Sequence, residues 1–210
     1  MTRASIAEQR RRGHWAWRGL AVLLFWLALF YYVSPIFGAA RLADALRSGD
    51  PARIADSIDF RSLRRSVARQ VLTEADSAAT GVQRNFAIQV GTRPVATWLD
   101  SMLTVDTISQ LLAGKLPPVL EVAGKTLTPL PPLEVDGMAD MARLWWRSGF
   151  LSFSEYRAVI GADGVQTGLR FRPASFSATR GFVWRLAGIE LPRPLLEAAV
   201  QHWRQVEAAS

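Results

Sequence analysis

Residues 19–40 read GLAVLLFWLALFYYVSPIFGAA, and this stretch decides how the whole chain is organised. It holds no charged residue, and as a helix it would extend about 33 Å, enough to cross the ~30 Å hydrocarbon core of a bilayer. Residues 20–30 would be apolar on every face of that helix, which suits lipid better than one side of a soluble core. Aromatic side chains stand near both ends, where the membrane interface favours them. We therefore predict a transmembrane anchor over residues 19–37.

The charges before this stretch predict its orientation. Residues 1–18 carry five arginines against Glu8 alone, so they contribute +4 of the chain's formal net charge of +7. Positive flanks stay in the cytosol, so residues 1–18 form a cytosolic basic stub and the rest lies across the membrane. The predicted location is a bacterial inner membrane, with a single pass and the C-terminal domain outside the cytosol. The remaining charges nearly balance, which argues against a nucleic-acid partner.

The apolar run has two other interpretations. A cleaved signal peptide would use the small residues Gly38, Ala39 and Ala40 as its cleavage site, although the run is longer than most signal cores. A buried helix of a soluble protein fits poorly with the arginines that precede the run. Membrane lipid is thus the partner expected for residues 19–37, while cleavage near Ala40 stays open.

Helix-start signals recur through the first half of the remaining chain. Ser34-Pro35, Asp50-Pro51 and Asp59 each resemble an N-cap, the first two with proline at the first helical position. They predict three helices, over 36–47, over about 51–57, and from Asp59 onward. Weaker patterns predict a helix over 93–102 and another that begins near Thr104 and stops at Gly114. Residues 38–114 thus form the helical part of an exported domain.

The second half changes from helical to strand periodicity. Five prolines within residues 115–137 exclude a long helix and indicate a linker or covering loop, followed by a helical stretch around 138–148. Apolar and polar residues then alternate in three segments that we expect to be antiparallel strands. Gly161–Gly164 supplies a hairpin turn, and an apolar stripe near the end predicts a final helix. The segments 152–160, 165–172 and 182–189 are the predicted strands, within a sheet-and-helix part that spans residues 138–210.

The predicted fold class is therefore α+β: an N-terminal transmembrane helix, then several helices packed on a small C-terminal antiparallel sheet, ending in a helix.

Three motifs also resemble a known family. They are Tyr32-x-Ser34-Pro35 at the membrane exit, Ile58-Asp59-Phe60-x-x-Leu63-Arg64, and Trp184-Arg185-Leu186-x-x-Ile189-x-Leu191-Pro192. Together they resemble a family of membrane-anchored bacterial proteins, the domain of unknown function 2939, over roughly residues 31–192. The resemblance implies a single anchor and an exported helical-then-β domain. It implies no activity.

No residue set predicts catalysis, and we expect neither a metal nor another cofactor. The chain has no cysteine, and its two histidines, His14 and His202, would lie on opposite sides of the membrane. Asp56 and Asp59 are close in sequence, but Asp59 is better explained as a helix cap. No glycine-rich phosphate loop is present.

Two sets of residues are candidate binding sites. The third predicted helix carries arginines away from its apolar stripe, which is either a solvated face or a contact with anionic lipid headgroups. Aromatic residues of the last third form either a packed core or an apolar ligand pocket. The possible lipid contacts are Arg61, Arg64, Arg65 and Arg69, and the possible pocket residues are Trp145, Phe153, Tyr156, Phe171 and Trp184.

The sequence therefore favours a non-enzymatic interaction or scaffold module, anchored by one helix on the outer face of the bacterial inner membrane, with an unknown protein partner. The alternative is a module that binds a small apolar ligand or anionic lipid.

Overall fold

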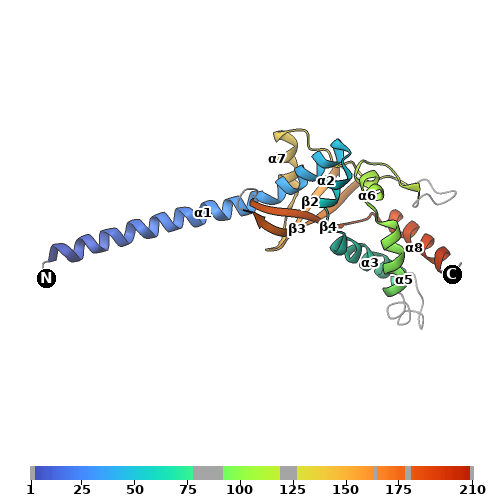
Figure 1. Cartoon of the computed structure of the whole chain (residues 1–210), viewed down its shortest axis with the longest axis horizontal. Helices are drawn as coiled ribbons and strands as arrows, with labels where there is room; N and C mark the ends of the chain where they lie inside the picture. The colour runs from blue at the N-terminus through green and yellow to red at the C-terminus, as the bar shows by residue number, and fades with distance from the viewer. Residues whose placement is uncertain (1–2, 78–91, 119–126, 163–164, 178–180, 209–210) are drawn as a thin grey trace.

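The computed structural model describes residues 3–77, 92–118, 127–162, 165–177 and 181–208, and one long helix dominates it (Figure 1). This helix, α1 (Arg3–Ser48), contains Pro35 in its interior. The prediction that Ser34 and Pro35 begin a separate helix is therefore wrong. The predicted end of that segment is confirmed, because α1 stops at Ser48 and Gly49 follows in the left-handed region, with φ 66°.

A neighbouring hydroxyl explains why Pro35 does not break α1. Proline has no N–H, so the carbonyl of Tyr31, four residues earlier, loses its helical donor. The Ser34 hydroxyl donates a hydrogen bond of 2.7 Å to this carbonyl and so satisfies it. Ser34 therefore repairs the helix at the position where the sequence pattern predicts a helix start.

The two halves of α1 have different surroundings. Residues 17–30 are exposed along their whole length, whereas burial begins at Ser34 and includes Ala39 and Leu42. The segment Trp17–Ser48 is one helix that is long and apolar enough to span a membrane. The first half of α1 thus projects from the folded domain, and the second half is part of its core (Figure 1).

Further helices follow α1, largely where the sequence predicts them. The Asp50 side chain accepts hydrogen bonds from the N–H groups of Ala52 and Arg53, and Thr104 accepts one from Thr107 N–H. These helices are α2 (Pro51–Asp56), α3 (Phe60–Ser77), α5 (Thr92–Met102) and α6 (Val105–Leu112).

The proline-rich segment covers part of the core. Among its described residues, 127–136 form neither helix nor strand, yet Leu130 and Leu133 are buried. Leu133 N–H donates to the carbonyl of Leu112 at 2.8 Å, which ties the segment to the end of α6. The helix α7 (Met138–Arg147) then leads into the sheet.

The sheet has four antiparallel strands in the order β1-β2-β3-β4. They are β1 (Gly149–Ser152), β2 (Glu155–Ala162), β3 (Val165–Ser177) and β4 (Gly181–Ile189). The strand β1 is one more than predicted, because Phe153 and Ser154 turn the chain inside the segment expected to be continuous up to Ile160. The predicted Asp163-Gly164 element of the hairpin turn lies outside the described residues. The last helix is α8 (Arg193–Ala208).

Helices pack against this sheet at β2 and β4. The second half of α1 crosses the apolar face of β4, where Gly38 lies against Trp184, while α7 packs on β2. The helix α3 packs on the far part of β4 and joins α5 and α8 in a group of three helices (Figure 1). The α+β class, with an apolar N-terminal helix, several helices and an antiparallel sheet before a final helix, is confirmed.

Candidate functional site

The helix α3 separates its apolar and basic residues as the sequence predicts. Leu63, Val67 and Val71 are buried against the core. The four arginines Arg61, Arg64, Arg65 and Arg69 lie on the remaining surface, half-buried at Arg64 and exposed at the other three positions. Asp59 precedes the helix and accepts a hydrogen bond of 3.1 Å from Ser62 N–H, which confirms its role as a cap.

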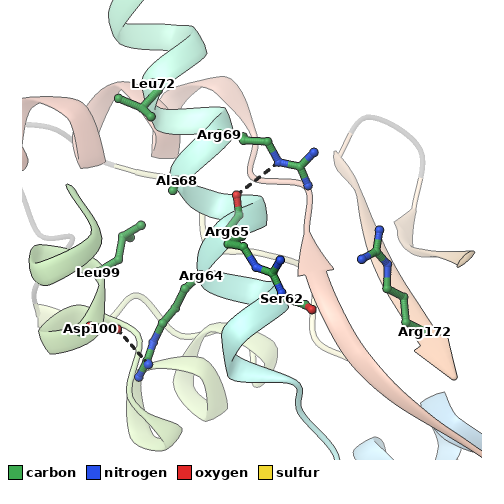
Figure 2. A pocket seen from close by; sticks show the side chains of 9 residues that line it. All are labelled: Ser62, Arg64, Arg65, Ala68, Arg69, Leu72, Leu99, Asp100 and Arg172. Atoms are coloured by element: carbon green, nitrogen blue, oxygen red, sulfur yellow. Dashed lines mark hydrogen bonds and ion pairs between the residues drawn. The ribbon is translucent and has the colours of Figure 1, made fainter. Parts of the chain in front are cut away.

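Three of the four arginines line a groove of about 570 Å³, which we call the arginine groove (Figure 2). Its apolar wall comes from α3 and α5, and Arg172 of β3 adds a fourth guanidinium. The groove is lined by Ser62, Arg64, Arg65, Ala68, Arg69, Leu72, Leu99, Asp100 and Arg172. Arg61 is not among the lining residues.

The guanidinium groups of the groove differ in how they are paired. Arg64 forms an ion pair with Asp100 of α5, with 2.9 Å between Nη1 and Oδ1 (Figure 2). The Nε atoms of Arg65 and Arg69 donate to backbone carbonyls one turn earlier. Among the described residues, no carboxylate lies within ion-pair distance of Arg65 or Arg69. The groove therefore has an excess of positive charge.

Its charge also acts on the helix cap. Burial raises the pKa of Asp59, but the hydrogen bonds from Ser62 and the positive charge of Arg65 outweigh burial and hold that pKa below its ordinary value. An arginine side chain stays protonated, so it cannot exchange protons near neutral pH. The groove is thus suited to binding an anionic group and not to acid–base chemistry.

A network of ion pairs extends from Arg172 over the polar face of the sheet. Arg172 contacts Glu155 at 3.2 Å, and Glu155 also lies 3.6 Å from Arg170. Glu190 accepts hydrogen bonds from Arg170 at 3.1 Å and from Arg157 at 2.5 Å. Burial raises the pKa of Glu190, but the bonds and charges of the two arginines outweigh it and lower that pKa. Most charges on this face are therefore satisfied within the sheet.

The path of β4 sets how far the arginine groove lies from the apolar half of α1. A side chain at Gly181, the start of β4, would contact the Phe30 ring, while Gly188 near its end lies against Ser66 of α3. Seven residue steps of strand separate these contacts, about 23 Å at the usual rise. The helix α3, which carries most of the groove, thus lies toward the end of the domain away from the projecting half of α1 (Figure 1).

The five aromatic residues expected to line a pocket fall into two groups. Tyr156, Phe171 and Trp184 are enclosed in the core, where burial raises the pKa of Tyr156 to about 12. Trp145 and Phe153 lie outside, against the tyrosines of α1: Trp145 contacts the Tyr32 ring and Phe153 stacks on Tyr31. The structure therefore does not bring the five together around one cavity.

The other titratable residues singled out by the sequence have structural surroundings. His202 lies on α8 with its ring 6.1 Å from that of Trp98, and Asp56 pairs with Arg185 of β4 at 2.5 Å. Within the described ranges, no group of three His, Asp or Glu side chains is placed to hold a metal ion.

Local sequence patterns do not predict the part of the groove contributed by other elements. Asp100 of α5 and Arg172 of β3 also line the groove. Arg172 in turn forms an ion pair with Glu155. The alternation of β3 predicts that Arg172 faces solvent. Only the packing of α3 across the far end of β4 brings it beside the arginines of α3.

Comparison with known protein families gives a match over part of the chain. The family model described as protein of unknown function (DUF2939) matches residues 24–111, which run from the apolar half of α1 to α6. The third motif of the resemblance, which begins at Trp184, lies beyond the matched residues. No curated protein and no solved structure matches the chain significantly. Over residues 24–111, less than half of its length, the chain is therefore similar to the DUF2939 family, whose function is unknown.

Proposed function

We propose that this chain is a non-enzymatic interaction module, anchored by α1 on the outer face of a bacterial inner membrane, and that its arginine groove binds an anionic group of a partner. The observation that carries the proposal is the pair Arg65 and Arg69, exposed and without a carboxylate partner in the described part of the chain, beside the apolar wall of the groove.

The anchor supports a role at a fixed position. The same helix supplies the apolar projection and part of the domain core, with no loop between them. The domain therefore cannot swing freely about a linker. A partner that binds the groove would be held at a defined height above the membrane, as a scaffold requires.

The chemistry of the groove favours a carboxylate or phosphate group that has an apolar neighbour. Guanidinium groups donate several hydrogen bonds in a plane, which matches the oxygens of such anions. Leu72 and Leu99 offer apolar contact beside these donors. This combination of charge and apolar surface is typical of protein interfaces, in which arginine is enriched.

A binding measurement with a defined probe tests this proposal. The full chain in nanodiscs of neutral phosphatidylcholine is titrated with a dye-labelled peptide of glutamate and leucine residues, and fluorescence anisotropy is recorded. The double substitution Arg65→Gln and Arg69→Gln should weaken binding at least tenfold, and salt should weaken binding of the unmodified chain. The matched control replaces Arg143 and Arg204, exposed arginines on α7 and α8, by Gln.

Equal binding by the two double variants would overturn the proposal, because only total charge would then matter. Lipid headgroups are the second candidate for the groove, supported by the same arginines. If they are the ligand, phosphatidylglycerol in the nanodisc should compete with the peptide. We favour the partner, because β4 carries α3 away from the projecting half of α1.

A further inference from the structure

The exposed apolar length of α1 is too short to cross a bilayer unaided. Arg18 marks one end of it, and the folded domain begins to bury α1 at Ser34. The 15 residues between them span about 22 Å, which is about 8 Å less than the hydrocarbon core. If α1 is the anchor proposed above, the bilayer must become thinner or the near end of the domain must enter it.

The end of the domain that adjoins the projecting half of α1, close to Phe30–Tyr32, exposes apolar and aromatic side chains. Leu151 and Phe153, in β1 and the β1–β2 turn, are 54% and 81% exposed, and Phe176 near the end of β3 is 64% exposed. Trp146, at the end of α7, is 87% exposed. Large exposed apolar groups that cluster in this way mark an interaction surface. We call Trp146, Leu151, Phe153 and Phe176 the collar.

Contacts with the aromatic residues of α1 fix two members of the collar, Phe153 and Phe176, near one height along the helix. The Phe153 ring stacks on Tyr31 with 4.7 Å between centroids, and the Tyr31 hydroxyl donates to the Phe153 carbonyl. Phe176 packs on Phe182, whose ring lies 6.3 Å from that of Phe30. Phe153 and Phe176 of the collar therefore lie where the projecting half of α1 ends.

A groove of about 570 Å³ continues from the collar onto the projecting half of α1. Leu24, Leu27 and Ala28 form one wall, and Phe150 and Phe153 form the other. Since the first wall belongs to the proposed span itself, the groove opens to whatever surrounds the span. In a membrane, that is lipid.

We infer that the collar inserts into the bilayer around α1 and that an acyl chain of the adjacent leaflet fills this groove. Residues 148–154 and 173–177 contain no charge, which permits insertion. The collar thus offsets the missing length of α1 and holds the domain on the membrane surface.

Depth-dependent quenching tests this inference, which rests on the proposed anchor. The chain has no cysteine, so a single introduced cysteine can carry a fluorophore without background. The substitutions Ser154→Cys and Ser175→Cys place labels beside Phe153 and Phe176 and leave both rings intact. Leu23→Cys reports on the anchor, and Ala113→Cys reports on an exposed site after α6. The full chain is placed in phosphatidylcholine vesicles that contain a nitroxide-labelled lipid, and iodide is the aqueous quencher.

We expect nitroxide lipid to quench labels 154 and 175 as it quenches label 23, and iodide to quench them at least about threefold less than label 113. Replacing Phe153 and Phe176 by Gln should increase the quenching of label 154 by iodide. The matched control Phe37→Gln, at an exposed phenylalanine beyond the collar, should not. Iodide quenching at 154 and 175 equal to that at 113, with label 23 in lipid, would overturn the collar alone. Iodide quenching at label 23 as well would overturn the anchor and the collar together.

Discussion

The hydroxyl of Ser34 makes two hydrogen bonds that connect α1 to the sheet. It donates to the Tyr31 carbonyl left without a partner by Pro35, and it accepts from the Trp184 indole N–H at 2.7 Å in the buried core. An indole N–H in the core would otherwise lack a partner, which is unfavourable by about 1–3 kcal/mol. One side chain thus stabilises both the continuous helix and the position of β4.

Neighbouring residues of β4 should differ sharply in their effect on stability. Trp184 is buried, so Trp184→Ala should lower the free energy of unfolding by about 3–5 kcal/mol through lost packing. Arg185 makes an ion pair with Asp56 in which both side chains are partly exposed, so Arg185→Ala should cost less than about 1 kcal/mol. Guanidinium unfolding of the full chain in detergent, followed by circular dichroism, measures both. Small and equal effects would contradict the described facing of β4.

Glu190 should make stability depend on pH. Its pKa is lowered in the folded chain by Arg157 and Arg170, so the carboxylate contributes stability above its unfolded pKa and loses it as pH falls through the folded pKa. Because the side chains are partly exposed, Glu190→Gln should cost about 1 kcal/mol at pH 7 and progressively less below about pH 4. Thermal unfolding across this range provides the measurement. A difference independent of pH, or an equal one for the exposed control Glu134→Gln, would rule out this role.

At the scale of elements, α1 and β4 approach closely because Gly38 has no side chain. A Cβ there would lie 2.7 Å from the Trp184 Cβ and 3.2 Å from its backbone oxygen, and neither atom can move easily. Gly38→Ala should therefore destabilise the domain, although alanine favours a helix by about 1 kcal/mol over glycine. Gly19→Ala, at a position with no neighbouring atoms, should not destabilise the domain. The unfolding midpoints of the two variants, compared with that of the unmodified chain, measure these effects. A Gly38→Ala variant that is more stable than the unmodified chain would contradict the close contact.

Local signals predict most of the elements. Asp50, Asp59 and Thr104 cap helices as their side-chain chemistry implies, and the stripe of Leu63, Val67 and Val71 faces the core. Predictions from local patterns are wrong where a residue distant in sequence gives the same side chain another hydrogen-bond partner. Ser34 and Pro35 have the pattern of a helix start, but Trp184, 150 residues away, uses the Ser34 hydroxyl inside a continuous helix. The β1–β2 turn at Phe153-Ser154 contains no glycine, asparagine or aspartate, so no turn signal divides the two strands.

At the scale of the whole molecule, the candidate site was only partly predictable. Periodicity places Arg64, Arg65 and Arg69 on one side of α3. It cannot show that Asp100 pairs with one of them or that Arg172 joins the others, since these contacts depend on how α5 and β3 pack. Nor can it show that Tyr156, Phe171 and Trp184 fill the core while Phe153 lies beside α1. The sequence shows which residues share a face of one element, and tertiary packing determines which faces come into contact.

The central claim is that α1 crosses the membrane and leaves the domain on the side opposite its basic N-terminal residues. Accessibility of single cysteines to a membrane-impermeant maleimide tests it most directly, with Ser5→Cys before the apolar run and Ala113→Cys in the domain. In intact spheroplasts of a bacterium that produces the chain, we predict labelling at 113 and none at 5, and labelling at both once the membrane is permeabilised. Protection of position 113 until permeabilisation would contradict the claim and place the domain inside the cell.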